Sequence, residues 1–204
     1  MLILRAQRGF TIVELMIGVG IVAMLLMLAV PSMSDYLQSS KLSTAANSYQ
    51  AGLQLARAEA IRMNVPVQFL LTDSPVTAGI ETAAALSPNG RNWVVRYTNP
   101  ATAAVVLVEA KSVAESTGQR AGAAPSLVVT GTPVAPAAAF DGSITFDGLG
   151  ATNSGGPIQL DLDNPAGGAC APAGPMRCQR IRISSGGQAH RCDRAASIGD
   201  SRAC

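Results

Sequence analysis

The stretch Arg8-Gly9-Phe10-Thr11-Ile12-Val13-Glu14-Leu15 opens the most distinctive segment of this sequence, an apolar run that continues to Val30. Between Phe10 and Val30 lie twenty-one residues, and Glu14 is the only ionisable side chain among them. About 20 apolar residues in a helix are enough to cross a bilayer. Arg5 and Arg8 precede the run, and positive charge there orients the short N-terminal part toward the cytoplasm. The sequence therefore predicts a membrane-spanning helix over residues 10–30, with the rest of the chain on the far side.

Glu14 needs a partner if it lies inside this helix. A carboxylate in a membrane span costs roughly 2.5 to 3.5 kcal/mol near the bilayer centre, and less near the interface. If the chain were cut between Gly9 and Phe10, the new amino group would lie within about one turn of the membrane entry and could face Glu14 of a neighbour. Alternatively, the Glu14 side chain extends to the cytoplasmic interface. The residues alone leave both interpretations open.

The helical pattern does not stop where the apolar run ends. A secretory signal would be followed by small residues at a cleavage site, whereas Pro31, Ser32 and Met33 lead into a second helical pattern, so we expect the segment to be retained. Apolar positions then recur at steps of three and four residues: Leu42, Ala45, Tyr49, Leu53, Ala56, Ala60 and Met63. The sequence thus predicts one helix, apolar over residues 10–30 and amphipathic over residues 31–63, with Pro66 helping to end it.

The motif from Arg8 to Leu15 resembles the class III leader junction of type IV pilins and of type II secretion pseudopilins. The resemblance implies that residues 1–9 are a prepilin leader, which a prepilin peptidase removes after Gly9 before methylating the new N-terminal residue, Phe10. It also implies that Glu14 neutralises the N-terminus of an adjacent subunit during assembly. Pro31 falls where the helices of this family kink.

Two further stretches resemble the FimT/GspH branch of this family. The first is LQLARAEAI, from Leu53 to Ile61, which is similar to the corresponding helix of these proteins. The second is the Phe146–Gly150 turn together with Arg180-Ile181-Arg182-Ile183 and the Gly186-Gly187 pair that follows. The matches cover both ends of the chain and its central helix, whereas residues 71–139 are generic.

After the helix the apolar period changes to two, which is typical of strands with one buried face. Clear alternation occurs at Val65–Leu71, Trp93–Tyr97 and Ile158–Leu162; shorter strands are expected at Val105–Glu109, Leu127–Thr130, Ser143–Phe146 and Gln179–Ser184. The sequence therefore predicts an α+β fold in which the long N-terminal helix packs on a small antiparallel β-sheet or β-sandwich. Residues 64–204 would form this domain, in the periplasm.

All four cysteines lie near the C-terminus: Cys170, Cys178, Cys192 and Cys204. An even number of cysteines at one end of an exported chain indicates disulfides and an oxidising compartment. We favour Cys170 with Cys178 and Cys192 with Cys204, because each pair closes a short loop at low entropic cost. Zinc is the alternative, but the chain has no CxxC pair and the gaps do not match the usual ligand spacings.

Composition gives no sign of catalysis, and we expect no enzyme activity, cofactor or metal. The one histidine, His190, has no nucleophile motif around it. Asp161 and Asp163 could bind calcium together with Asp147 or Asn164, yet alternate acids on a strand are more often its solvated face. The formal charge of +2 is too small for wholesale electrostatic binding of nucleic acid.

A local basic cluster nevertheless occupies the C-terminal region: Arg177, Arg180, Arg182, His190, Arg191, Arg194 and Arg202. Arg180 and Arg182 share one strand face, so we expect their guanidinium groups to project together into solvent. Some FimT-type pilins bind DNA during natural transformation through a glycine-arginine-x-arginine motif. The matching stretch here reads Gly187-Gln188-Ala189-His190-Arg191 and lacks the first arginine. We therefore favour a solvated strand face and subunit contacts over DNA binding by Arg180, Arg182, His190, Arg191 and Arg194.

The resemblance implies an interaction protein, a minor pilin involved in type IV pilus assembly. Its partners would be other pilins and minor pilins in a filament, the prepilin peptidase and the inner membrane, in which it would be a single-pass protein until assembly places it outside the cell. The alternatives are a DNA-binding minor pilin, a GspH-type pseudopilin of a type II secretion system and, in a different class, a membrane-anchored periplasmic enzyme.

Overall fold

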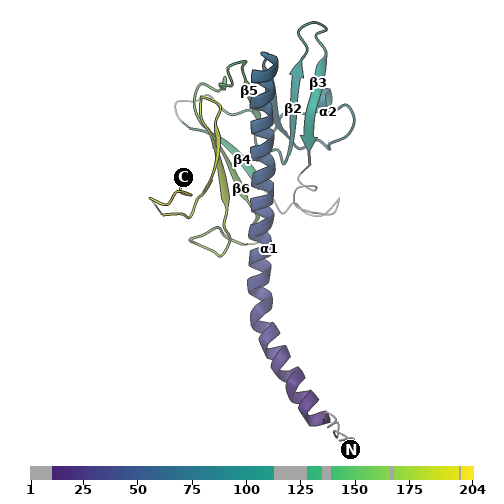
Figure 1. The fold of residues 1–204 in the computed structure, drawn as a ribbon, viewed down its shortest axis with the longest axis vertical. Helices are drawn as coiled ribbons and strands as arrows, with labels where there is room; N and C mark the ends of the chain where they lie inside the picture. Colours follow the sequence, from purple (N-terminus) through teal and green to yellow (C-terminus); the bar gives the residue numbers. More distant parts are fainter. Residues whose placement is uncertain (1–10, 113–127, 135–138, 166–167, 198) are drawn as a thin grey trace, which may run out of the picture.

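The structure is a computed structural model that describes residues 11–112, 128–134, 139–165, 168–197 and 199–204. Gly9 and Phe10 lie outside the described residues, as does the leader expected over residues 1–9. The described chain forms a long helix with a β-domain at its C-terminal end (Figure 1).

The long helix α1 spans Ile12–Met63 and continues through position 31 without a break. Thr11 is the N-cap of this helix and has an extended backbone. Its Oγ1 accepts a hydrogen bond from Glu14 N at 3.2 Å. Its end is set by Asn64, which adopts a left-handed conformation with φ 52° and so turns the chain out of the helix two residues before Pro66. The helix is visibly curved, and its N-terminal half extends away from the β-domain (Figure 1).

The C-terminal half of α1 carries the buried face that the sequence predicts. Six of the seven predicted positions are at most 1% exposed, and Met63 is partly buried. Polar groups on the same face also find partners: the Tyr49 hydroxyl donates to Arg91 O, and Trp93 Nε1 donates to Ser48 Oγ at 3.1 Å. Burial raises the pKa of Tyr49, so its hydroxyl stays protonated as a donor.

Eight strands form two four-stranded antiparallel sheets. The first has the order β3-β2-β1-β5, with bounds Val105–Lys111, Asn92–Thr98, Val67–Thr72 and Ser143–Phe146. The second has the order β4-β6-β7-β8, with bounds Val128–Pro133, Ile158–Asp163, Gln179–Ile183 and Ala189–Asp193. Residues of both sheets and of α1 share one hydrophobic core, and α1 runs between the sheets (Figure 1). The α+β fold class is confirmed.

Two elements were not predicted. The short helix α2, Ile80–Ala83, covers the outer face of the first sheet by packing Ile80 against Leu70 and Val94. The edge strand β8 lacks an apolar alternation, because Arg191 is the residue that faces α1. The predicted seven strands are all present, with bounds that agree or shift by one to three residues; Leu127 lies outside the described residues.

Two disulfides fasten the C-terminal region. Cys170 is bonded to Cys178 and Cys192 to Cys204, the pairs that short loops favour, and no described cysteine is free. The first loop carries Met176 into the core, where its side chain is fully buried. The second ties Cys204 to the edge strand β8.

Candidate functional site

The N-terminal half of α1 is an apolar surface that the β-domain does not cover. Its large hydrophobic side chains are each between 54% and 79% exposed: Ile12, Val13, Leu15, Met16, Ile17, Val19, Ile21, Val22, Met24, Leu25, Leu26 and Met27. A helix that is apolar all round is stable only when another apolar phase or other helices surround it. An exposed apolar surface of this size marks a site of association with protein or lipid.

Within the described residues, no helix is both long enough and apolar enough to cross a bilayer. The span expected over residues 10–30 remains a prediction.

Glu14 lies at the third position of α1, and its side chain is exposed. The Thr11–Glu14 spacing is that of a capping box, in which the threonine hydroxyl accepts from the backbone of the third residue. A negative charge in the first helical turn is also favoured by the helix dipole. Thr11 therefore caps the start of α1, a role that the Thr-x-x-Glu pattern before an apolar run also indicates.

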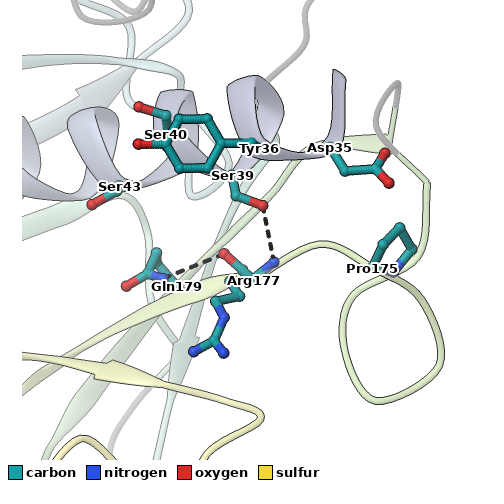
Figure 2. A pocket seen from close by; sticks show the side chains of 8 residues that line it. All are labelled: Asp35, Tyr36, Ser39, Ser40, Ser43, Pro175, Arg177 and Gln179. Atoms are coloured by element: carbon teal, nitrogen blue, oxygen red, sulfur yellow. Dashed lines mark hydrogen bonds between the residues drawn. The ribbon is translucent and has the colours of Figure 1, made fainter. Parts of the chain in front are cut away.

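A hollow lies where α1 meets the segment that leads into β7. Figure 2 shows Asp35, Tyr36 and Ser39 on the helix side and Pro175 and Arg177 on the sheet side. Arg177 N donates to Ser39 Oγ at 3.4 Å, which joins the two walls. The other lining groups are serine hydroxyls and the amide of Gln179. With Asp35 as its one acid and Arg177 as its one base, the hollow offers polar contacts rather than a catalytic constellation.

Most members of the basic cluster have a hydrogen-bond or ion-pair partner within the domain. Arg180 is held by Asp161 on β6, with Nε 2.6 Å from Oδ1 and Nη2 2.9 Å from Oδ2, and only a quarter of its side chain is exposed. This hydrogen bonding raises the pKa of Arg180. Arg182 Nη1 instead donates to Cys204 O at 2.8 Å. The expectation that the two guanidinium groups project together into solvent was wrong for Arg180, because its cross-strand neighbour is an aspartate; Arg182 is exposed.

The other cluster members also have local partners. Arg191 faces α1 and donates to Ser43 Oγ at 3.2 Å and Asn47 Oδ1 at 2.7 Å, whereas His190 lies on the opposite face of β8, across from Arg182. The remaining arginines each pair with an aspartate: Arg177 with Asp193, Arg194 with Asp163 and Arg202 with Asp200. The hydrogen bond from Arg202 lowers the pKa of Asp200 to about 2. Of the five candidate DNA-binding residues, Arg182, His190 and Arg191 line one hollow, whereas Arg180 and Arg194 are paired with aspartates.

Gly187, the glycine of the candidate DNA motif, has a packing role. It adopts φ +75°, and a Cβ here would overlap the carbonyl oxygen of Gly150 and lie 3.2 Å from Arg57 Nε. The same Arg57 Nε donates to Gly150 O at 3.0 Å. Glycine at position 187 thus lets the β7–β8 turn close against both α1 and the turn after β5.

The candidate metal ligands are used differently. Asp161 and Asp163 each receive an arginine, and Asp147 Oδ1 accepts from the backbone of its own turn. In the described residues, Asp163 also lies beside Cys170 and Cys178, with the ligand atoms within 4.8 Å of one another. Because those two sulfurs are bonded to each other, they offer no thiolate to a metal.

Comparisons with known proteins give two family matches. A family model described as type II transport protein GspH matches residues 45–187, which is more than half of the 204 residues. A model described as the prokaryotic N-terminal methylation motif matches residues 4–30. No curated protein matches the chain significantly.

The solved structures that the chain matches include proteins of three bacteria. The type IV minor pilin FimU of Pseudomonas aeruginosa is 15% identical with a TM-score of 0.49, and the match covers 76% of this chain and 90% of FimU. The minor pseudopilin EpsH of the Vibrio cholerae type 2 secretion system is 11% identical with a TM-score of 0.47, over 75% and 97%. GspH of E. coli is 14% identical with a TM-score of 0.43, over 80% and 93%.

Proposed function

The chain belongs to the type II transport protein GspH family, and from this we propose that it is a minor pilin that joins a type IV pilus-like filament. A prepilin peptidase cuts the precursor after Gly9 and methylates Phe10, in keeping with the N-terminal methylation motif matched at residues 4–30. Before assembly the mature chain is a single-pass inner-membrane protein with its β-domain in the periplasm. In the filament, its partners are other pilins and minor pilins.

The observation that carries this proposal is the contrast between the two halves of α1. The C-terminal half buries its apolar face in the domain, whereas every large hydrophobic side chain from Ile12 to Met27 is more than half exposed. Burying a leucine, isoleucine or methionine side chain stabilises by about 1.5 to 3 kcal/mol, so a dozen such residues strongly favour a surrounding of lipid or helices. Lipid before assembly and the helices of other pilins after it supply these surroundings.

Glu14 gives the helix a means of fixing its axial position among its neighbours. A carboxylate among apolar helices is costly unless a positive group meets it. Cleavage after Gly9 creates such a group, the amine of Phe10, four residues from Glu14 in every mature copy. Pairing Glu14 of one subunit with this amine of another would set the stagger between them.

The proposed role is structural and involves no catalytic turnover. The β-domain is stabilised by two disulfides, as suits a protein that works outside the cytoplasm. Four of the six C-terminal arginines form ion pairs with aspartates, which supports a structural role for the cluster. A DNA-binding function is therefore not part of the proposal.

Replacing Gly9 with valine tests the proposal. The expected result is a precursor that keeps its leader, runs at a higher mass on a gel and is absent from sheared filaments. Gly18→Ala is the matched control, because a Cβ at Gly18 meets no atom within 4 Å in the subunit; this variant should be processed normally. Normal processing and filament incorporation of Gly9→Val would refute the proposed function.

A further inference from the structure

The hollow where α1 meets the segment that leads into β7 has no part in the proposed function. Its volume is about 500 Å³, within the roughly 300 to 1,000 Å³ that small-molecule sites occupy. Figure 2 shows Asp35 and Tyr36 on the α1 side of it and Arg177 on the sheet side. The hydrogen bond from Arg177 N to Ser39 Oγ joins the two walls. The hollow is therefore a feature of the folded subunit that can be assigned a ligand.

Exposed apolar side chains border this hollow on α1. Met33, Tyr36 and Leu37 are 64%, 71% and 52% exposed, whereas the β-domain buries the helix from Leu42 onward. Positions 33, 36 and 37 are three and four residues apart, so their side chains share one face of the helix. Tyr36 belongs both to this face and to the lining of the hollow. A ligand in the hollow would thus touch an apolar surface at its edge.

The position of the hollow along α1 is at the level of lipid headgroups when the helix is inserted in a membrane. The span expected over residues 10–30 corresponds to about 31 Å of helix at 1.5 Å per residue, close to the roughly 30 Å thickness of the hydrocarbon layer. Headgroups fill about 5 to 8 Å on each side of that layer. Asp35 and Tyr36 lie about 8 to 9 Å beyond position 30 on the same scale. We call this feature the membrane-proximal hollow.

Two side chains of opposite charge line the membrane-proximal hollow. Arg177 pairs with Asp193 through Nη1 at 3.3 Å, and 63% of the Arg177 side chain is exposed. Because a guanidinium group has five N–H donors, this pair leaves others for a phosphate. The Asp35 carboxylate is an acceptor for an ammonium group. The lining therefore matches a ligand that carries a phosphate and an amine together.

We propose that the membrane-proximal hollow binds the headgroup of an aminophospholipid in the periplasmic leaflet of the inner membrane. Arg177 donates to its phosphate, and Asp35 accepts from its ammonium group. The inference rests on the proposed function, because only an inserted α1 brings the hollow to this depth. An anionic headgroup without an amine would instead bring a second negative charge toward Asp35. Tyr36 supplies an amphipathic ring of the kind that is enriched at membrane interfaces.

The test is native mass spectrometry of the full chain, purified from membranes in detergent. The probe is palmitoyl-oleoyl phosphatidylethanolamine, and phosphatidylcholine with the same acyl chains is the comparison lipid. The wild-type chain should bind the ethanolamine lipid about tenfold more tightly, because the quaternary ammonium of choline has no N–H to donate to Asp35. Arg177→Gln should weaken binding of the ethanolamine lipid about tenfold, the loss expected when one charge-assisted hydrogen bond is removed. Arg177→Lys should restore most of it, since lysine also binds phosphate.

Two further variants complete the experiment. Asp35→Asn should bind the two lipids equally, because an amide is a weaker acceptor for ammonium than a carboxylate. Arg194→Gln is the matched control: Arg194 also pairs with an aspartate, Asp163, at 2.8 Å, but it does not line the hollow. This control should keep the wild-type lipid preference.

The readouts separate this inference from the proposed function. Equal binding of the two lipids by the wild-type chain would overturn the headgroup inference, as would a wild-type preference retained by Asp35→Asn. Asp35 precedes the buried part of α1, so Asp35→Asn should melt like the wild-type chain and decides the case if Arg177→Gln melts lower. Neither result touches cleavage after Gly9 or filament incorporation, which are measured separately. A wild-type chain found only in the soluble fraction of its cells would overturn both.

Discussion

Replacing Gly187 with alanine should destabilise the β-domain even though the change adds a single methyl group. Gly187 is buried, has φ +75° and stands where a Cβ would overlap Gly150 O. The added methyl group must therefore push the β7–β8 turn away from the turn after β5. Displacing these turns would also break the hydrogen bond from Arg57 to Gly150 O.

Two contributions set the expected magnitude. A left-handed conformation costs a residue with a Cβ about 1 to 2 kcal/mol. Loss of the hydrogen bond between the Arg57 guanidinium and the Gly150 carbonyl leaves both groups unsatisfied, which costs about 1 to 3 kcal/mol more. The free energy of unfolding should therefore fall by about 2 to 5 kcal/mol.

The assay is urea unfolding of the full chain in detergent, followed by circular dichroism. Gly186→Ala is the matched control, because the nearest atom to its Cβ is Ser184 Oγ at 3.8 Å and its φ is not in the left-handed region. This control should change the free energy of unfolding by less than about 1 kcal/mol. Equal midpoints for the two variants would refute the packing role assigned to Gly187.

Two further predictions concern the core and the C-terminal loop. Leu53→Ala should lower the free energy of unfolding by about 2 to 5 kcal/mol, because Leu53 is fully buried. The control Gln54→Ala, at an exposed neighbouring position, should have little effect. Similar losses of stability in the two variants would contradict the helix face assigned to Leu53. The pKa of Asp200 should be about 2 rather than near its ordinary value of 3.8, because the carboxylate accepts a hydrogen bond from Arg202. Because the folded pKa is depressed, this pair stabilises above pH 3.8 and its contribution disappears as the pH falls toward 2. Carbon-13 NMR of the Asp200 carboxyl group measures the value, and an ordinary pKa would show that the pair does not form.

The elements that local periodicity specifies were predictable from sequence. The buried face of α1 follows from apolar residues at helical spacing, and it was assigned correctly from Leu42 to Ala60. Three strands follow from clear period-two alternation, and the four shorter strands that the sequence suggested are also present. The end of α1 at Met63 was also predicted, although the residue that turns the chain out of the helix is Asn64, in a left-handed conformation, and not Pro66.

The pairing of distant segments could not be read from local pattern. Arg180 on β7 pairs with Asp161 on the adjacent strand β6, 19 residues away in sequence. Only the register of β6 on β7 brings these two side chains together. Strand β8 was missed because Arg191 occupies a position facing the helix, where a polar contact with Ser43 and Asn47 replaces an apolar one. The division into two sheets is equally non-local, since β5 joins the first sheet although β4 precedes it in the second.

The identity of the first residue in the mature chain tests the central claim most directly. Intact mass spectrometry of the protein purified from its own cells, with sequencing of the N-terminal peptide, would measure it. The account predicts a chain that begins with N-methylated Phe10, so that its amine is available to Glu14 of a neighbouring subunit. A chain that still begins at Met1, with Gly9 and Phe10 joined, would contradict it.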